Sequence, residues 1–320
     1  MTKTRCLNLD GMFAPVPYPE IDFQLIQFGG KEQHIKLKTN INYEELDKVI
    51  ITNRFKGDED ITKVLFAKDA LERMGVKKFD FIMPYAPYAR QDRQEVVGES
   101  FTLKVIADLI NFAKFDKVII LDAHSNVTPA LINNCRNIPN YNFVYEAFVD
   151  IITNNPETIV PSLSKNRLGE IENTIRGGNY CLVSPDAGAN SKVNKLQKRL
   201  DEMTFSESES RMVFKLPVVK CDKSRNPNNG SLGGFEVLTS SLEGKDCLIV
   251  DDICARGGTF VGVANALKEK GAGKIYLLVT HYEGVADEKV LREAGISKVY
   301  KTNSMNDIET DFIKSIKIQL

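Results

Sequence analysis

The chain has 320 residues, of which 42% are hydrophobic and 27% are charged, and its formal net charge at pH 7 is −1. A nearly neutral chain has no overall electrostatic attraction to nucleic acid or to an acidic membrane surface, so we expect neither as a partner. The length is sufficient for two domains of about 150 residues each.

The cysteines and the N-terminus lead to expectations about the compartment. Six cysteines are scattered along the chain without a Cys-x-x-Cys pair. A chain of this size does not depend on disulfides for its core, so we expect reduced thiols. The first residues lack the apolar core of a signal peptide, and no run of about 18 apolar residues is present to span a membrane. We therefore expect a cytoplasmic protein.

Short apolar runs alternate with helical patterns along the chain. The runs that indicate buried strands are residues 79–84, 117–121, 181–184, 247–250 and 275–280. Apolar residues at helical spacing indicate helices within 61–74 and 103–110. Alternation of this kind predicts βαβ units and mostly parallel sheets. The sequence therefore predicts an α/β protein with two similar domains, one at 1–145 and one at 146–320.

Three segments are less regular. Residues 154–179 contain two prolines and a Gly-Gly pair, which indicate an excursion near the domain boundary. Residues 205–211 are rich in Ser and Glu and indicate a solvated loop. A strand predicted at 212–219 leads into a Gly- and Asn-rich loop that ends near Gly234.

Residues 84–94 follow the first of the predicted strands and contain Arg90 and Gln91. Polar side chains just beyond the carboxyl end of a strand are where open α/β sheets bind ligands. A guanidinium can bind phosphate or stack on a base, and a glutamine amide can hydrogen-bond to a base. A solvated charged loop is the alternative, but the two residues before Arg90 resemble a family signature, and this resemblance favours a functional site.

Two other predicted strand ends carry candidate metal ligands. His124 follows the strand at 117–121, and a histidine beside an acid can bind a metal or a phosphate, or have a structural role. Asp186 lies in a turn of small residues before a predicted helix. There it suits a magnesium or pyrophosphate site, and it can also cap the helix.

Residues 219–227 include the cations Lys223 and Arg225, where the predicted loop begins. Cations on a loop that closes over a substrate can stabilise the charge on a transferring phosphoryl group. A solvated basic loop is the alternative interpretation.

Residues 248–259 carry the strongest signal. An apolar strand ends in Asp251 and Asp252, and a Gly-Gly-Thr turn then begins an amphipathic helix. Backbone N–H groups at a helix start favour a phosphate, and the two carboxylates can hold ribose hydroxyls directly or through Mg²⁺. The pattern resembles the ribose-binding loop of the type I phosphoribosyltransferase fold. An ordinary strand-turn-helix corner is the alternative.

In this order, the segments resemble the ribose-phosphate pyrophosphokinases, also called 5-phosphoribosyl-1-pyrophosphate synthetases, over about residues 24–304. The resemblance implies two type I phosphoribosyltransferase-like domains, each a mostly parallel sheet flanked by helices. It implies an enzyme that uses Mg²⁺ and ATP, moves the β,γ-pyrophosphate of ATP to the 1-hydroxyl of a 5-phosphorylated ribose, and releases AMP. It also implies a homo-oligomer, either a dimer or a hexamer.

The resemblance further implies a role for each matching residue. The implied roles are ATP binding for Arg90 and Gln91 and, from a neighbouring subunit, for Phe28 and Glu32; magnesium binding for His124 and Asp186; catalysis for Lys223 and Arg225; ribose binding for Asp251 and Asp252; and binding of the 5-substituent for Arg256, Gly257, Gly258 and Thr259. The match at 28–32 is incomplete, because Gly30 and Lys31 replace the Asp and Gly of the family pattern.

One departure from the family bears on the sugar substrate. The family's phosphate loop has Asp-Thr before the Gly-Gly-Thr turn, whereas this chain has Ala255 and Arg256. A guanidinium there suits an acceptor with more than one phosphate, such as ADP-ribose, whose product would feed NAD synthesis as in some viral relatives. The longer segments 154–179 and 201–212 could wall a larger pocket. Ribose 5-phosphate and ADP-ribose both remain open as acceptors.

Two other functions share part of the pattern. A phosphoribosyltransferase would use the loop at 251–259 but would not need Arg90 and Gln91, nor a second α/β domain. A non-catalytic regulatory subunit of a synthetase would not need the pair Lys223 and Arg225. The sequence argues against a P-loop kinase, because no Gly-x-x-x-x-Gly-Lys-Ser/Thr sequence occurs.

Overall fold

The computed structural model describes residues 3–155, 161–165, 171–175, 179–202, 204–207, 210–213, 216–225 and 232–320. By their contacts these residues form two compact units. Unit 1 comprises Met1–Pro139, Asn303–Asp307 and Lys317–Leu320, and unit 2 comprises Asn140–Thr302 and Ile308–Ile316. The predicted domain boundary at 145 stays a prediction.

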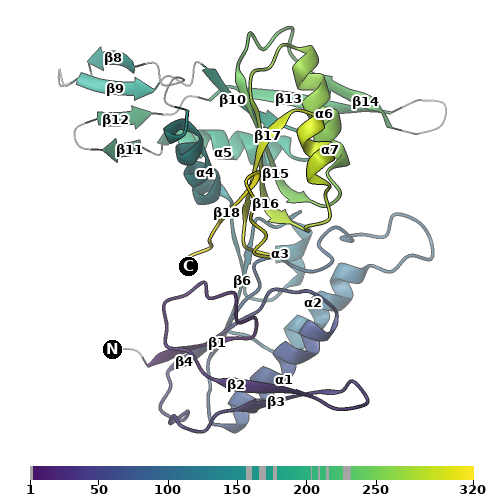
Figure 1. Ribbon diagram of the computed structural model, residues 1–320. Helices are drawn as coiled ribbons and strands as arrows, with labels where there is room; N and C mark the ends of the chain where they lie inside the picture. The colour runs from purple at the N-terminus through teal and green to yellow at the C-terminus, as the bar shows by residue number, and fades with distance from the viewer. Residues whose placement is uncertain are drawn as a thin grey trace. The chain divides into compact units, whose positions relative to one another are not determined.

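Unit 1 is built on a parallel sheet (Figure 1). Within its described residues the strand order is β1-β4-β5-β6-β7, with β1 at Thr4–Asn8, β4 at Lys48–Thr52, β5 at Phe79–Ile82, β6 at Lys117–Leu121 and β7 at Cys135–Ile138. The helices are α1 at Glu59–Arg73, α2 at Thr102–Phe112 and the short α3 at Val127–Leu131.

The two faces of the unit 1 sheet are covered in different ways. The apolar stripes of α1 and α2 pack on one face, where alternate strand residues such as Val49, Phe81 and Ile120 form the main core. On the other face, Ile50 and Ile82 pack against side chains from the N-terminal loop and the C-terminal segment. The period of two along each strand explains this division, because successive side chains point to opposite faces.

An antiparallel hairpin accompanies the unit 1 sheet (Figure 1). It consists of β2 at Phe23–Gln27 and β3 at Gln33–Leu37. Ile35 and Leu37 of β3 are buried in the core that also contains the inner side of α1. The alternate residues of β3 are exposed or half-buried, so the hairpin is fixed on one side and its turn projects into solvent.

Unit 2 contains a larger sheet. Within its described residues the strand order is β14-β13-β10-β15-β16-β17-β18, with β10 at Tyr180–Ser184, β13 at Val218–Arg225, β14 at Leu232–Val237, β15 at Asp246–Cys254, β16 at Ile275–Tyr282, β17 at Ile296–Thr302 and β18 at Ile313–Ile316. All neighbours are parallel except β13 and β14, which are antiparallel.

Helices cover both faces of the unit 2 sheet. They are α4 at Tyr141–Thr153, α5 at Asn190–Glu202, α6 at Gly258–Glu269 and α7 at Glu288–Glu293. Leu248 and Val250 of β15 pack with α4 and α5, whereas Cys247 and Ile249 pack with α6 and α7. This arrangement explains why the central strand β15 contains the continuous apolar run of residues 247–250, since both of its faces are buried there.

The structure confirms the five buried strands and the two helices expected from the periodicity. It also confirms the predicted fold class, two α/β domains with mostly parallel sheets. In the part of the chain that the structure describes, no helix is both long and apolar enough to cross a membrane. The cytoplasmic location stays a prediction.

The expectation of one strand over 212–219 was wrong. The described residues there form two strands, β12 at Ser210–Val213 and β13 from Val218, and Pro217 stands directly before β13. Proline cannot donate a backbone hydrogen bond to a sheet, so it separates the two strands. The carbonyl of Pro217 still accepts a bond from the Leu182 N–H, at 2.9 Å.

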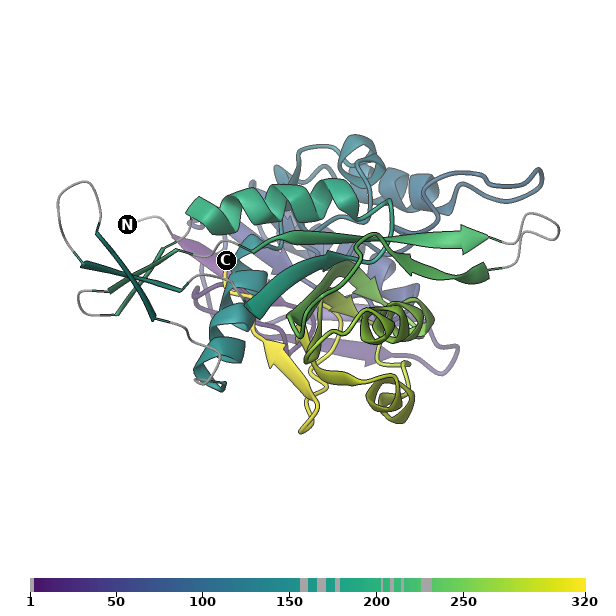
Figure 2. The same cartoon turned by 90° about the horizontal axis from the view of Figure 1, so that it is seen from above.

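Two segments expected to be loops contain strands. Strand β11 at Thr204–Glu207 pairs antiparallel with β12, where a solvated loop over 205–211 was expected. The segment after Val219, expected to be a loop, continues β13 to Arg225 as a two-stranded ribbon with β14, which Figure 2 shows from above. The predicted loop residues 226–231 lie outside the described part of the chain.

The excursion expected at 154–179 contains a further hairpin. Its strands are β8 at Pro161–Lys165 and β9 at Ile171–Ile175, which pair antiparallel. Strand β9 contacts β12, so the two hairpins of unit 2 lie beside each other (Figure 1). The other residues between 156 and 178 lie outside the described part of the chain.

Candidate active site

The turn between β15 and α6 has a geometry that only glycine fits. Gly257 is buried and has a φ of +80°, in the left-handed region that residues with a Cβ avoid. A Cβ at this position would lie 3.1 Å from Cδ2 of Leu291 and 3.4 Å from Cβ of Ala286. The backbone therefore turns sharply at Gly257 and enters α6 at Gly258.

The start of α6 presents a positively polarised end. The carbonyl of Gly257 accepts from the N–H groups of Phe260 and Val261, both at 3.0 Å, which fixes the first turn of the helix. Arg256 and Gly258 are exposed, and Thr259 is half-buried. A helix N-terminus with an adjacent guanidinium suits an anionic ligand. The four residues predicted to bind the 5-substituent, Arg256–Thr259, thus lie together.

Three carboxylates lie close together at the carboxyl ends of β10 and β15. Asp251 and Asp252 are adjacent on β15, and the N–H of Asp252 donates to Oδ1 of Asp251 at 2.9 Å. Burial raises the pKa of the Asp251 carboxyl well above its usual range, and the nearby carboxylates of Asp252 and Asp186 raise this pKa further. The structure therefore brings the predicted ribose-binding acids and one predicted magnesium ligand into one cluster.

Asp186 also serves the helix that follows it. Its Oδ1 accepts from the N–H of Ala189 at 3.1 Å, immediately before α5 begins at Asn190. This bond holds the turn that leads into α5, and the capping of the helix itself by Asp186 stays a prediction. One carboxylate oxygen is used in this way, and the carboxyl still lies near Asp251.

Lys192 lies beside the carboxylate cluster, and the sequence did not lead us to expect it there. It lies on α5, and its Nζ is 3.7 Å from Oδ1 of Asp252, with about a third of its side chain exposed. A small cavity of about 10 Å³, close to the volume needed by one water molecule, is lined by Asn140, Ala189, Lys192, Val193, Leu196, Val250 and Asp251. The signal in the sequence is a lysine six positions after Asp186, in the first turn of the helix.

In unit 1, Arg90 and Gln91 lie in an exposed turn beyond the carboxyl end of β5. The N–H of Gln91 donates to the carbonyl of Tyr88 at 2.8 Å, and the carbonyl of Gln91 accepts from the N–H of Leu103 at 3.3 Å. Hydrogen bonds on both sides hold the backbone of this turn, while both predicted ATP-binding side chains face solvent.

His124 lies beyond the end of the neighbouring strand β6, and it is exposed. Asp122, two residues before it, is buried and has a φ of +40°. The backbone is held there by two bonds, from the Asp122 N–H to the carbonyl of Ile138 at 2.7 Å and from the Ala123 N–H to Oδ1 of Asn137 at 3.0 Å. Because β5 and β6 are parallel neighbours, the histidine and the Arg90 turn follow the same sheet edge.

Phe28 and Glu32 lie at the exposed turn of the β2–β3 hairpin. The N–H of Phe28 donates to the carbonyl of Glu32 at 2.9 Å, and Lys31 between them has a φ of +66°. The Phe28 ring is 53% exposed and lies 6.3 Å from the ring of His34, centroid to centroid. An exposed aromatic ring on a projecting turn fits the expectation that this element serves a neighbouring subunit.

The predicted catalytic pair lies on the ribbon of unit 2. Lys223 and Arg225 are residues of β13, paired in register with Phe235 and Leu232 of β14. The register shifts between Ser224 and Arg225. The side chains of Lys223 and Arg225 lie outside the described part of the structure, so their predicted role stays a prediction.

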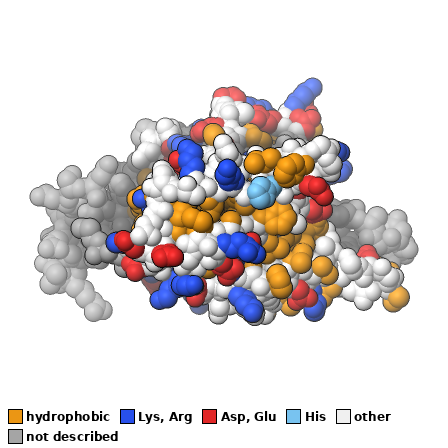
Figure 3. Space-filling model, turned by 90° about the horizontal axis from the view of Figure 1, so that it is seen from below, with side chains coloured by type: hydrophobic (Ala, Val, Ile, Leu, Met, Phe, Trp, Pro, Cys, Tyr) orange, Lys and Arg blue, Asp and Glu red, His pale blue; other side chains and the backbone are white. Residues whose placement is uncertain are grey.

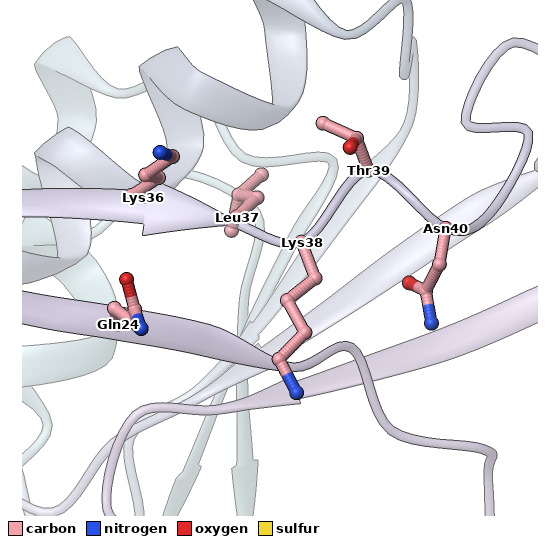
Figure 4. Close-up of a pocket in the computed structure, with 6 residues that line it drawn as sticks. All are labelled: Gln24, Lys36, Leu37, Lys38, Thr39 and Asn40. Carbon is pink, nitrogen blue, oxygen red and sulfur yellow. The ribbon is translucent and has the colours of Figure 1, made fainter.

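A wider groove of about 410 Å³ lies elsewhere, on the hairpin of unit 1 (Figure 4). It is lined by Gln24, Lys36, Leu37, Lys38, Thr39 and Asn40. The Nζ of Lys38 is 3.0 Å from Oδ2 of Asp22, and Figure 4 shows the side chains of Lys36 and Lys38 pointing in different directions. The groove contains none of the predicted site residues and no converging cations.

Comparisons with known proteins match most of this chain to one protein family. Residues 16–113 match the family model for the N-terminal domain of ribose phosphate pyrophosphokinase, and residues 149–312 match the phosphoribosyl transferase domain. A ribose-phosphate pyrophosphokinase of Agrobacterium fabrum is 27% identical, with 90% of this chain and 78% of that protein covered. Another, from Corynebacterium ammoniagenes, is 30% identical, with 84% and 74% covered.

A solved structure has the same fold. The crystal structure of phosphoribosylpyrophosphate synthetase from Mycobacterium smegmatis superposes with a TM-score of 0.73. The match covers 99% of this chain and 95% of that one, at 19% sequence identity. The fold, with two phosphoribosyltransferase-like domains, is therefore shared.

Proposed function

Because this chain belongs to the ribose-phosphate pyrophosphokinase family and is a diphosphotransferase of that type, we propose that it moves the β,γ-pyrophosphate of Mg-ATP to the anomeric hydroxyl of a 5-phosphorylated ribose. The observation that carries this proposal is the β15–α6 turn, where paired carboxylates and a helix N-terminus lie together. A phosphorylated ribose offers both of the complementary groups, hydroxyls and a phosphate.

The sugar would be held at its two ends. Asp251 and Asp252 bind the ribose hydroxyls, and Gly257, Gly258 and Thr259 bind the 5-phosphate through the first turn of α6. The left-handed backbone at Gly257 supports this role, because it directs the chain from the carboxylates into the helix start within a few residues.

ATP would be held by the exposed groups of unit 1. Arg90 and Gln91 bind the nucleotide, and Phe28 and Glu32 do so from the hairpin of a neighbouring subunit. The guanidinium supplies charge for the phosphates, and the exposed Phe28 ring supplies a surface on which a base can stack.

The donor set at the carboxylate cluster fits Mg²⁺. Asp186 and Asp251 offer the oxygen ligands that Mg²⁺ prefers, and the ion takes one or two carboxylates together with substrate phosphates and water. Among the described residues no group of three or more His, Cys, Asp or Glu side chains could hold a metal unaided, which agrees with a site completed by substrate. In unit 1, His124 is the residue that we propose for magnesium binding. When bound, the ion would neutralise phosphate charge.

The proposed step needs little covalent chemistry from the protein. The 1-hydroxyl oxygen attacks the β-phosphorus, the bond from that phosphorus to the oxygen shared with the α-phosphate breaks, and AMP leaves. Positioning in line and neutralising charge supply most of the rate in such transfers. We expect Lys223 and Arg225 to contact the transferring pyrophosphate group. Their position on a ribbon that extends β13 beyond its pairing with β10 supports this role.

Two acceptors fit the sugar site, ribose 5-phosphate and ADP-ribose. Arg256 is the observation that favours ADP-ribose, because its exposed guanidinium lies beside the start of α6 and could bind a second phosphate. The product would then be ADP-ribose 1-pyrophosphate, a precursor suited to NAD synthesis.

The test supplies the purified protein with Mg-ATP and either ribose 5-phosphate or ADP-ribose. AMP release is followed, and the mass of each product is measured. We expect AMP together with a product heavier than the acceptor by one diphosphate group. The absence of AMP with both sugars would contradict the proposal and favour a phosphoribosyltransferase or a non-catalytic subunit.

We also propose that the protein is a homo-oligomer. Val105, Leu109 and Phe112 form an apolar stripe at helical spacing on the outer side of α2, and Phe112 is 77% exposed. Figure 3 shows that hydrophobic side chains gather near the centre of one face of the molecule. Exposed apolar areas of this kind mark interaction surfaces, and a second copy would also bring a Phe28 hairpin to a neighbouring site.

A further inference from the structure

Strained backbone recurs in the segments to which we assign ATP and metal binding. Among the described residues, six that are not glycine have a positive φ, and three of the six are Lys31, Tyr88 and Asp122. Lys31 directly precedes Glu32, Tyr88 lies two residues before Arg90, and Asp122 lies two residues before His124. Such strain persists only where surrounding contacts impose it, and it gathers at ligand-binding sites.

Tyr88 is the most unusual of the three, because a bulky aromatic residue rarely adopts a φ of +60°. Its backbone carbonyl accepts the Gln91 N–H at 2.8 Å and so closes the turn that carries Arg90 and Gln91. Its ring is half-buried against the main core of unit 1. The tyrosine is therefore anchored by its ring at the base of the nucleotide-binding turn.

The phenol of Tyr88 has a specific partner. Its hydroxyl donates to the carboxylate of Asp58, the residue before the first turn of α1. An aspartate at this position ordinarily accepts a hydrogen bond from the helix it begins, yet the Asp58 side chain makes no such bond. The hydrogen bond to Asp58, with burial, also raises the pKa of Tyr88. The Asp58 carboxylate therefore accepts a hydrogen bond from the Tyr88 hydroxyl and does not cap α1.

We propose that Tyr88 and Asp58 form a positioning pair for the proposed reaction, which holds the strained turn so that Arg90 and Gln91 are preorganised for ATP. The inference rests on the proposed role of Arg90 and Gln91. Neither member of the pair needs to touch the nucleotide. The bond between them ties the turn after β5 to the start of α1, so the turn keeps its conformation when ATP is absent.

The test measures ATP binding and turnover for Tyr88→Phe, Asp58→Ala and the double variant. Tyr88→Phe keeps the ring and removes only the hydroxyl. We expect the Kd for ATP and the KM for ATP to rise about fivefold, the ratio that a hydrogen bond of about 1 kcal/mol gives. We expect kcat and the KM for the sugar to stay within about twofold. The double variant should be no worse than either single variant, because both remove one interaction.

The matched control is Tyr300→Phe in unit 2. The Tyr300 hydroxyl donates to Oδ2 of Asp150 at 2.9 Å, so this variant removes the same kind of bond away from the Arg90 turn. We expect it to lower the thermal unfolding temperature but to leave the Kd for ATP unchanged.

Three outcomes separate this inference from the proposed function. A Tyr88→Phe protein that unfolds earlier but binds ATP as tightly as the wild type would show a purely structural role and overturn the inference. Additive losses in the double variant would overturn it as well. If the wild type binds ATP without releasing AMP, the proposed function fails, and a weaker Kd in Tyr88→Phe still supports the pair.

Discussion

Replacing Gly257 by alanine should weaken both unit 2 and its sugar site. An alanine would have to adopt the φ of +80°, which costs an L-residue about 1–2 kcal/mol. Its Cβ would also lie 3.1 Å from Leu291, tighter than an ordinary contact, so that leucine must shift. We expect the free energy of unfolding to fall by about 2 kcal/mol, which for a domain of this size lowers the melting temperature by roughly 4–8 °C.

Two other glycines, one at the start of α6 and one just beyond its end, separate the backbone cost from the loss of sugar binding. Gly271, beyond the end of α6, has a φ of +79° with no atom within 4 Å of a Cβ, so Gly271→Ala isolates the backbone cost. Gly258, the first residue of α6, also has open space around a Cβ but no positive φ. Gly258→Ala should leave stability nearly unchanged and still raise the KM for the sugar, because its methyl group would occupy the proposed phosphate position.

The assays are thermal unfolding followed by circular dichroism and AMP release at varied sugar concentration. We expect Gly257→Ala to lose stability and to raise the KM for the sugar, and Gly271→Ala to lose about half as much stability with an unchanged KM. A Gly257→Ala protein as stable as the wild type would refute the argument from backbone conformation. An unchanged KM for the sugar in Gly258→Ala would show that the phosphate binds elsewhere.

Three further predictions concern other parts of the chain. Lys223→Ala should lower kcat by a factor on the order of 10²–10³ while both substrates still bind in calorimetry; near-normal turnover would remove this residue from the mechanism. Arg256→Asp should raise the KM for ADP-ribose about tenfold more than that for ribose 5-phosphate, and equal effects in steady-state kinetics would contradict our reading of Arg256. Ile318→Ala should lower the free energy of unfolding by about 2–4 kcal/mol, because Ile318 is buried against Phe13 and Ile50; chemical denaturation that shows no loss would mean that this contact does not form in solution.

The parts of the fold that the sequence predicted are those determined by local pattern. Strands such as β15 and β16 contain continuous apolar runs, at 247–250 and 275–279, and these follow from burial on both faces of a parallel sheet. The placement of Asp251 and His124 was predictable for the same reason, since Asp251 follows the apolar run of residues 247–250 and His124 lies three residues beyond the end of β6. The parallel topology then puts such residues at one edge of their sheet.

The parts that were missed depend on contacts distant in sequence. The ribbon pairs residues of β13 with residues of β14, and no local pattern near Lys223 indicates β14 as the partner strand. Pro217 is a local signal for the break before β13, and the prediction of one strand over 212–219 did not take this proline into account. Lys192 was missed because its proximity to Asp252 depends on how α5 packs beside β15. The strain at Tyr88 was equally hidden, because only the fold imposes it.

The C-terminal part of the chain shows why sequence order alone does not define unit 1. Arg54 is 2% exposed, and its guanidinium binds Asp10 at 2.6 Å, Asp307 at 2.7 Å and the carbonyl of Asn303 at 3.1 Å. Two of these three partners come from the segment that returns to unit 1 after unit 2. Removing one partner from a buried ion pair costs about 3–5 kcal/mol, because the charge left behind is uncompensated. A fragment that ends at residue 145 would lack Asp307 and Asn303, and it would also lack Ile318, which covers the second face of the sheet. The returning segments are therefore part of the folded unit that presents the proposed ATP-binding residues.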